Sequence, residues 1–335
     1  MEKFREKFGA GVIGRGNPYK GGIEQGIAYD LYELNRPIIQ QNAGKPRILG
    51  GYQSVALDLL NHFSTQKGSR ILEIGSGTGI GTLELVSLNP TCSLICIESS
   101  EGMIELARYK FNHLDEDYIL RRTNDLSLIR YWTSFRSRSL EFKDNVKFLM
   151  SNFEDTILNH ESIDSAIAFS SLYHTDLTKS FRNLYNFLTN NGFIIWDGSS
   201  HFYDDKDFPS SNYGFRYNDF LGYVLDEIGK KLDLLGDYRN LSKPKVNLDE
   251  IMEITLKEGL FTEKIAIYLT PVDLQIFIKN FVPHIVRVLV PKETDEEYFN
   301  EVLKEGIGKA ITNPSALNDN NHKYGIKAIF KSKKI

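Results

Sequence analysis

Residues 70–79 of this 335-residue chain read RILEIGSGTG and carry its most informative structural pattern. The first half of this stretch, Arg70 to Ile74, is a short apolar run that predicts a buried strand. Glycines follow at every second position, and the run Ile80 to Leu88 predicts a helix directly after them. Glycines in such a turn let the backbone bend tightly and approach a ligand, and the helix N-terminus offers free N–H groups. The stretch therefore predicts a strand, a ligand-binding turn and a helix.

Strand and helix patterns continue to alternate between residues 51 and 198. Apolar residues at helical spacing, such as Met103, Leu106 and Ala107, separate short apolar runs. The further strands expected from these runs are 93–97, 146–150, 165–169 and 193–197. This alternation is typical of an α/β fold, in which helices cover both faces of a parallel sheet.

The composition narrows the class of protein. A content of 41% hydrophobic and 25% charged residues is that of an ordinary globular chain. The 40 Lys and Arg residues balance 44 Asp and Glu residues, which argues against a nucleic-acid partner. We expect no membrane partner either, because the chain has no run of about 18 apolar residues and its start carries charges unsuited to a signal peptide. Cys92 and Cys96 lie in one buried run, so we expect a cytoplasmic protein without a disulfide or a metal site.

Three stretches fall outside the alternating pattern, namely 1–50, the Arg-rich 115–145 and 199–246. We expect 1–50 to be an N-terminal cap segment around a helix near Ile23 to Leu34, 51–198 to be the core, 199–246 to be a cap insertion, and 247–335 to complete the core sheet. The insertion is rich in aromatic residues: Phe202, Tyr203, Phe208, Tyr213, Phe215, Tyr217 and Phe220. They could form a cap over a ligand, or the core of a small subdomain.

An acidic residue stands at the place where a ribose would bind. Glu98 closes the second expected strand, 25 residues after Glu73. A carboxylate at this place can accept hydrogen bonds from both hydroxyls of a ribose. The glycine spacing is G-x-G-x-G, whereas dinucleotide-binding proteins have G-x-G-x-x-G.

The sequence resembles the class I S-adenosylmethionine-dependent methyltransferases. The motifs that carry the resemblance are ILEIGSGTG, IESSEGMIELAR, LMSNFED, SIDSAIAFSSLYH and NNGFIIWD. It covers residues 51–198 closely and the remainder in outline. It implies a Rossmann-like, seven-stranded, mostly parallel sheet, closed by strands near 264–269 and 324–330, with one antiparallel strand near the end. It also implies S-adenosylmethionine as the cofactor.

The resemblance assigns roles to residues of the expected cofactor site. Glu73 would orient the methionine end of the cofactor, and Gly75 and Gly77 would allow close backbone approach. Glu98 would bind the ribose diol. Ser99 and Met103 would flank the adenine, Asn152 and Phe153 would meet its edge, and Ser76 and Ser170 would complete the site.

Two departures from the family pattern bear on the substrate. Asn152 stands where the family often has Asp, and its carbonyl can accept from an adenine amino group. The fourth strand is followed by SSLYH, whereas enzymes that methylate base amino groups have Asn/Asp-Pro-Pro-Tyr there. The chain is therefore similar to the small-molecule branch, and the aromatic insertion favours an apolar or aromatic substrate.

Two histidines could serve as a general base for a hydroxyl acceptor. His174 follows the fourth strand and His201 follows the fifth, at the edge where open α/β sheets bind ligands. Tyr173 could orient the acceptor. All three side chains could instead be structural.

Two other functions fit the same fold. An aminopropyl transferase would need an acidic polyamine site after the fourth strand, where this chain has SSLYHTD. A cofactor-binding partner subunit without catalysis of its own would need no catalytic residue. The acceptor atom and the oligomeric state stay open.

Overall fold

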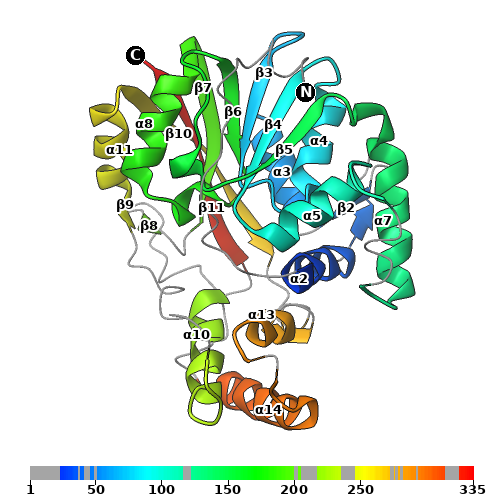
Figure 1. Ribbon diagram of the computed structural model, residues 1–335. Helices are drawn as coiled ribbons and strands as arrows, with labels where there is room; N and C mark the ends of the chain where they lie inside the picture. Colours follow the sequence, from blue (N-terminus) through cyan, green and yellow to red (C-terminus); the bar gives the residue numbers. More distant parts are fainter. Residues whose placement is uncertain are drawn as a thin grey trace.

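The computed structural model describes residues 23–36, 38–40, 46–48, 51–115, 122–199, 203–204, 217–234, 246–271, 275, 278–279, 282–291, 293–313 and 324–335. Seven strands form one sheet in the order β10-β11-β7-β6-β3-β4-β5 (Figure 1). Their bounds are β3 Arg70–Ile74, β4 Ser93–Glu98, β5 Val146–Met150, β6 Ile163–Ala168, β7 Leu188–Ser199, β10 Leu260–Pro271 and β11 Tyr324–Lys334. β11 runs antiparallel to both of its neighbours, while β3 to β7 pair in parallel. The predicted seven-stranded, mostly parallel sheet is confirmed.

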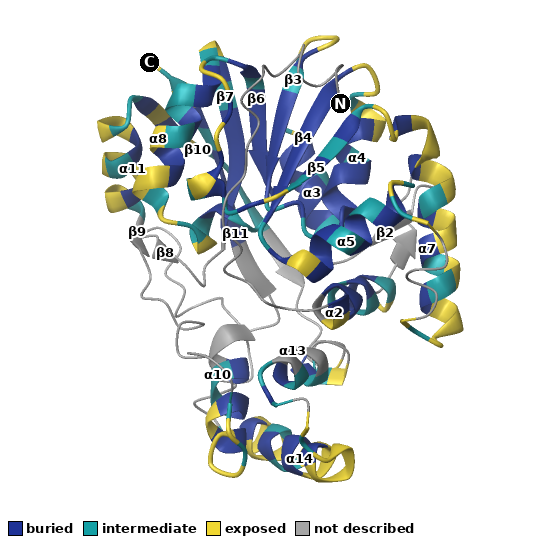
Figure 2. Cartoon of the chain, in the orientation of Figure 1, coloured by how far each residue is buried: buried dark blue, intermediate teal, exposed yellow. Residues whose placement is uncertain are grey.

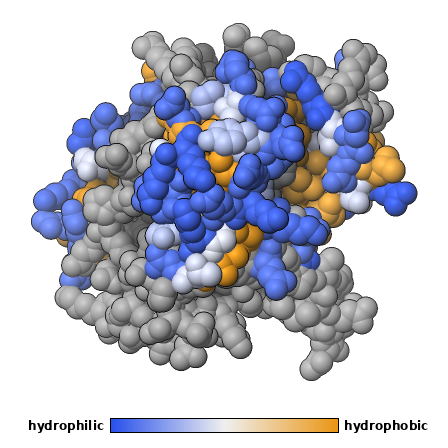
Figure 3. All heavy atoms as spheres, turned by 90° about the horizontal axis from the view of Figure 1, so that it is seen from below, coloured by the Kyte–Doolittle hydropathy of each residue, from blue (hydrophilic) through white to orange (hydrophobic). Residues whose placement is uncertain are grey.

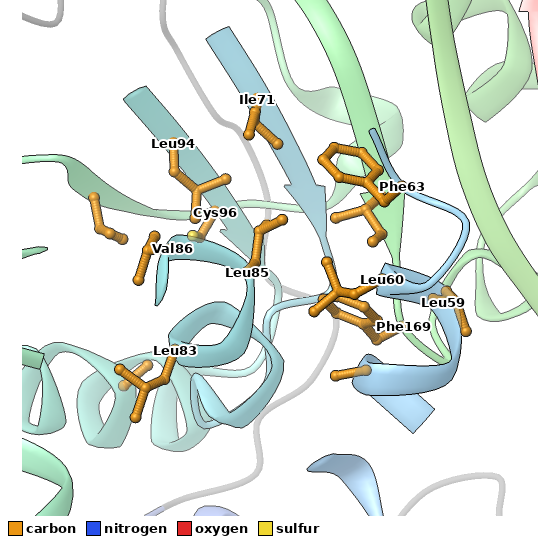
Figure 4. Close-up of a cluster of buried hydrophobic side chains, with 14 of the residues drawn as sticks. Leu59, Leu60, Phe63, Ile71, Leu83, Leu85, Val86, Leu94, Cys96 and Phe169 are labelled. Atoms are coloured by element: carbon orange, nitrogen blue, oxygen red, sulfur yellow. The ribbon is translucent and has the colours of Figure 1, made fainter. Parts of the chain in front are cut away.

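Helices cover both faces of this sheet. On one face lie α3 (Tyr52–Leu60), α4 (Ile80–Leu88) and α5 (Glu101–Lys110), and on the other lie α8 (Leu177–Phe187) and α11 (Leu248–Lys257) (Figure 1). Side chains of a strand point alternately to the two faces. Ile71 accordingly packs with Leu59 and Leu83 in one core cluster (Figure 4), whereas the next residue, Leu72, belongs to the opposite cluster. The central strands are buried on both sides, which explains their continuous apolar runs (Figure 2).

Four helices lie beyond the carboxyl ends of the parallel strands (Figure 1). They are α2 (Ile23–Leu34), α10 (Tyr217–Ile228), α13 (Val282–Val288) and α14 (Glu296–Thr312). The last three share a buried cluster that includes Phe220, Val286 and Phe299, and Tyr32 of α2 joins it. Seen from this end, the described side chains are mostly hydrophilic, with smaller hydrophobic areas between them (Figure 3). The chain thus leaves the sheet after β10, forms helices that pack on α10, and returns as β11.

The expected cap segments lie only partly within the described residues. Phe220 of the aromatic insertion is buried among the helices α10, α13 and α14. The side chains of Phe202, Tyr203, Phe208, Tyr213, Phe215 and Tyr217 lie outside the described residues. In the Arg-rich stretch, α7 (Leu126–Ser139) buries Trp132 and Phe135 and exposes Arg130.

The remaining elements are short. β1 (Ile38–Gln40) pairs with β2 (Pro46–Ile48), and β8 (Tyr203–Asp204) pairs with β9 (Val246–Asn247). There are also three described 3₁₀ turns. η1 (Leu140–Phe142) follows α7, η2 (Phe153–Asp155) follows β5, and η3 (Leu172–His174) follows β6. Within the described ranges, every helix is too short or too polar to cross a membrane.

Candidate cofactor and active site

The glycine turn after β3 has a backbone that requires glycine. Gly75 and Gly77 have φ values of 69° and 54°, in the left-handed region. A Cβ on Gly75 would lie 2.2 Å from the Cβ of Ser171, so no side chain fits there. A Cβ on Gly77 would meet only the Sδ of Met103, at 3.9 Å, among the described residues. The Ser171 side chain therefore packs closely on Gly75, whereas the described residues leave space beside Gly77.

The carboxylate of Glu98 faces this turn from the end of β4. Its Oε2 accepts a hydrogen bond from the Gly77 N–H at 2.8 Å, and its Oε1 accepts one from the Ser100 N–H at 2.8 Å. Burial raises the pKa of Glu98, and hydrogen bonds from Ser100, Gly77 and Ser99 oppose this rise. The structure thus brings Glu98, Gly77, Ser99 and the buried Met103 together, as the sequence predicts for a ribose and adenine site.

Three polar atoms of the expected cofactor residues are buried without a hydrogen-bond partner in the described part of the chain. They are Oε1 of Glu73, Oγ of Ser76 and Oδ1 of Asn152. Buried polar atoms in proteins nearly always have a partner, and an orphaned one marks a place where a ligand can supply it. S-adenosylmethionine carries an ammonium group and an adenine amino group, and both can donate hydrogen bonds to these oxygens. The residues present therefore fit this cofactor.

Asn152 and Phe153 can contact an adenine with different parts of the residue. The Nδ2 of Asn152 donates to Asp155 at 3.0 Å, which leaves its carbonyl oxygen as the atom available to a donor. The side chain of Phe153 is buried in the core beneath the sheet, with its ring centroid 6.3 Å from that of Phe187. Only the backbone of Phe153 can therefore meet an adenine edge.

Glu73 is fully buried at the end of β3. Its Oε2 accepts from Thr82 Oγ1 at 2.7 Å and from Cys96 Sγ at 3.2 Å. Burial raises the pKa of Glu73 to about 7, although these two hydrogen bonds act in the opposite direction. Without a bound ligand, the carboxyl group therefore changes between its protonated and ionised forms near neutral pH.

This raised pKa predicts a pH-dependent cofactor affinity. A ligand ammonium group on Glu73 favours the ionised carboxylate, so below pH 7 the proton must leave before the ligand binds. We expect the affinity for S-adenosylhomocysteine to fall roughly fivefold between pH 7 and pH 6, and the Glu73→Gln variant to lose this dependence. Calorimetric titration at both pH values checks this. Equal pH profiles in wild type and variant would contradict a contact between Glu73 and the ammonium group.

A second cluster of polar residues joins the ends of β6, β7 and β11. Lys327 Nζ lies 2.9 Å from Asp197 Oδ2 and donates to Ser170 Oγ at 2.7 Å. Ser170, with φ of 51°, also donates its backbone N–H to Asp197 Oδ1. The Tyr173 side chain hydrogen-bonds to the side chain of Ser170, and burial followed by the charge of Asp197 raises the pKa of Tyr173 well above its usual value. We call Ser170, Tyr173, Asp197 and Lys327 the Lys327 cluster.

The structure describes only one of the two candidate bases, His174 and His201. His174 ends the 3₁₀ turn η3 with an exposed side chain, and its ring centroid lies 4.6 Å from that of Tyr173. His201 lies outside the described residues. Tyr173 therefore belongs to the Lys327 cluster, whereas the side chain of His174 is exposed beside it.

A buried ion pair connects the N-terminal helix α2 to the glycine turn. Asp30 of α2 accepts from Lys110 Nζ at 2.9 Å, from Thr78 Oγ1 at 2.5 Å and from Trp132 Nε1 at 2.7 Å. The side chains of Asp30 and Lys110 are both fully buried. Burial lowers the pKa of Lys110, while Asp30 opposes this shift. This pair was not foreseen from the sequence, and it fixes α2 over the cofactor turn.

Aromatic side chains of α2 and α3 meet near this site. The rings of Tyr29 and Tyr52 stack with centroids 5.1 Å apart, and both side chains are half-buried. Tyr29 is close enough to Tyr173 to affect its ionisation. Tyr32, also on α2, packs in the buried cluster of the outer helices that includes Phe220 of α10.

Known proteins resemble this chain in its core. Residues 72–196 match the family described as a methyltransferase domain. The chain is 24% identical over 172 residues to a malonyl-[acyl-carrier protein] O-methyltransferase of Bacillus cytotoxicus, covering 49% of this chain and 50% of that protein. The chain thus spans about half the length of the curated relative that it matches.

The fold is also similar to that of a solved structure. The YcgJ protein from Bacillus subtilis superimposes with a TM-score of 0.50 at 14% identity, covering 84% of this chain and 97% of that protein. This likeness concerns the fold. Together with the matched family and the fitted cofactor residues, it identifies residues 72–196 as a class I methyltransferase domain whose cofactor is S-adenosylmethionine.

Proposed function

We propose that this protein transfers a methyl group from S-adenosylmethionine to a small molecule bound at the carboxyl edge of the sheet. The observation that supports this most directly is the contact between two sites. Ser171, which follows Ser170 of the Lys327 cluster, packs against Gly75 of the cofactor turn. A substrate held by the cluster would therefore lie next to the cofactor.

Different residues of the site would hold different parts of the cofactor. Glu73 and Ser76 would hold the methionine end, Glu98 would hold the ribose, and Asn152 would accept from the adenine amino group. When bound, S-adenosylmethionine supplies a methyl group that is already activated on a sulfonium. The protein then has to align the acceptor and exclude water, and α2, fixed by Asp30, lies where it would exclude water.

Half-buried tyrosines support an apolar or aromatic substrate. Tyr29 and Tyr52 form a stacked pair, and Tyr29 interacts electrostatically with Tyr173. Aromatic rings offer large contact areas for apolar ligands, and their hydroxyl groups can orient a polar substituent. We propose that these three tyrosines line the substrate side of the site, with a cap formed by the segments 1–50 and 199–246.

The general experiment uses the full chain and methyl-labelled S-adenosylmethionine with a small-molecule cell extract. We expect a labelled small product and formation of S-adenosylhomocysteine. Gly77→Val, whose side chain would occupy the space above the turn, should abolish both. Cofactor binding without any labelled small product would contradict this function and would favour a non-catalytic partner subunit.

The roles of Tyr173 and His174 can be separated by two substitutions. A general base contributes about 100- to 10,000-fold, and a base works best shielded from solvent. Because His174 is exposed, we expect His174→Gln to keep turnover within about threefold of wild type, while Tyr173→Phe lowers it about tenfold or more through the lost hydrogen bond. Turnover is measured as S-adenosylhomocysteine formation with the extract. A loss of 100-fold or more in His174→Gln alone would establish His174 as the base.

A further inference from the structure

The Lys327 cluster holds a positive group at the carboxyl edge of the sheet, beside the cofactor turn. β6 and β7 run in parallel with Trp196 opposite Ala168, so Asp197 lies level with the end of β6. β11 runs antiparallel to β7 with Lys327 opposite Ser199. Three strands that are distant in sequence therefore bring Ser170, Asp197 and Lys327 to one point of the carboxyl edge.

The charges in this cluster are not equally accessible. Asp197 is fully buried and accepts from the Ser170 N–H, from Ser170 Oγ at 3.1 Å and from Lys327. The side chain of Lys327 is 10% exposed, and Asp197 and Ser170 take two of the three hydrogens of its ammonium group. Within the described part of the chain, the ammonium group is therefore the more accessible of the two charges.

The cluster borders the cofactor turn directly. Ser171 donates from its Oγ to the carbonyl oxygen of Ile74, the last residue of β3. Gly75, the first glycine of the turn, follows Ile74 and packs on Ser171. Tyr173, one turn of η3 away, adds a hydroxyl group through its hydrogen bond to Ser170.

We infer that Lys327 binds the acceptor atom and that this atom is an acidic oxygen, either of a carboxylate or of an acidic hydroxyl group that reaches the site already ionised. The inference rests on the proposed methyl transfer and names its substrate class. An ammonium group stabilises an oxyanion by a charge-assisted hydrogen bond, whereas it repels a protonated amine. The acceptor oxygen forms the new bond to the methyl carbon with one of its lone pairs, and the carbon–sulfur bond breaks with its electrons going to sulfur. An oxygen that arrives ionised releases no proton in this step, which agrees with an exposed His174.

The first test is the position of the methyl group in the labelled product obtained with the cell extract. Mass spectrometry of the product should show a methyl ester, or a methyl ether of an acidic hydroxyl group. A label on nitrogen, sulfur or carbon would overturn this inference and leave the proposed function standing. The absence of any labelled product would overturn both.

The second test compares variants with the acceptor thus identified. Lys327→Met should weaken its binding about ten- to hundredfold, measured by calorimetry in the presence of S-adenosylhomocysteine. The double variant Lys327→Met with Asp197→Asn removes the unpaired buried carboxylate, so it should regain thermal stability without regaining acceptor affinity. Asp197→Asn alone keeps the lysine and removes its counter-charge, so it should lower the acceptor KM.

Lys333→Met serves as the matched control, because Lys333 lies exposed on the same strand. We expect it to bind the acceptor like the wild type. If the double variant also binds the acceptor like the wild type, the Lys327–Asp197 pair is only structural and the inference is wrong.

Discussion

Replacing Lys110 by methionine should lower the free energy of unfolding by about 3–5 kcal/mol. The substitution leaves Asp30 as a fully buried carboxylate without its cation. Thr78 and Trp132 still donate to Asp30, but two neutral donors do not balance a charge that has been removed from water. Chemical denaturation followed by circular dichroism measures the difference.

A double variant separates the charge effect from a packing effect. Asp30→Asn added to Lys110→Met removes both charges and keeps a carbonyl oxygen for Thr78 or Trp132, so it should recover most of the lost stability. Asp30→Asn alone leaves a buried lysine without its anion and should also be unstable. A Lys110→Met variant within about 1 kcal/mol of wild type would show that the buried pair does not hold α2 in place.

Replacing Glu98 by alanine should weaken the binding of S-adenosylhomocysteine on the order of a hundredfold. Hydrogen bonds to a charged group are worth about 1.5–3 kcal/mol each, and the ribose diol would lose two of them. The structure adds a second cause, because Glu98 also accepts from the N–H groups of Gly77 and Ser100 and so holds the turn itself. Calorimetry gives the affinity, and a thermal melt shows whether the variant is folded.

Two further variants sharpen this result. Glu98→Gln keeps the shape and one acceptor oxygen, so its affinity should lie between those of wild type and Glu98→Ala. Glu101→Ala removes an exposed carboxylate three residues along the chain and should bind like the wild type. Unchanged affinity in a folded Glu98→Ala variant would exclude Glu98 from the ribose site.

The sheet could be predicted from the sequence because its strands are buried on both faces. Continuous apolar runs predicted β5 with the bounds that the structure has, and the helical pattern did the same for α4 and α2. β7 extends to Ser199, beyond the expected end of its run, because β11 pairs with it up to that residue. Antiparallel pairing between distant segments leaves no local pattern, so the ends of these strands could not be predicted.

The cofactor side of the site could also be predicted, since its residues follow a strand in short motifs. Glu98 and Gly77 are 21 positions apart, and they meet because Glu98 ends β4, Gly77 follows β3, and these two strands are parallel neighbours. The polar clusters could not be predicted, because Asp30 and Lys110 are 80 positions apart and Ser170 and Lys327 are 157 positions apart. In the sequence, a lysine that forms a buried ion pair cannot be distinguished from a lysine on the surface, because its acidic partner is known only from the fold.

A structure of the full chain with bound S-adenosylhomocysteine would show directly whether the residues around the glycine turn hold the cofactor. We expect both ribose hydroxyl groups at hydrogen-bonding distance, about 2.6–3.2 Å, from the carboxylate of Glu98. We also expect the adenine amino group at Asn152 Oδ1 and the amino acid end beside Glu73, next to the Lys327 cluster. A ligand bound elsewhere, or bound over the turn without a contact to Glu98, would show that these residues do not form the cofactor site.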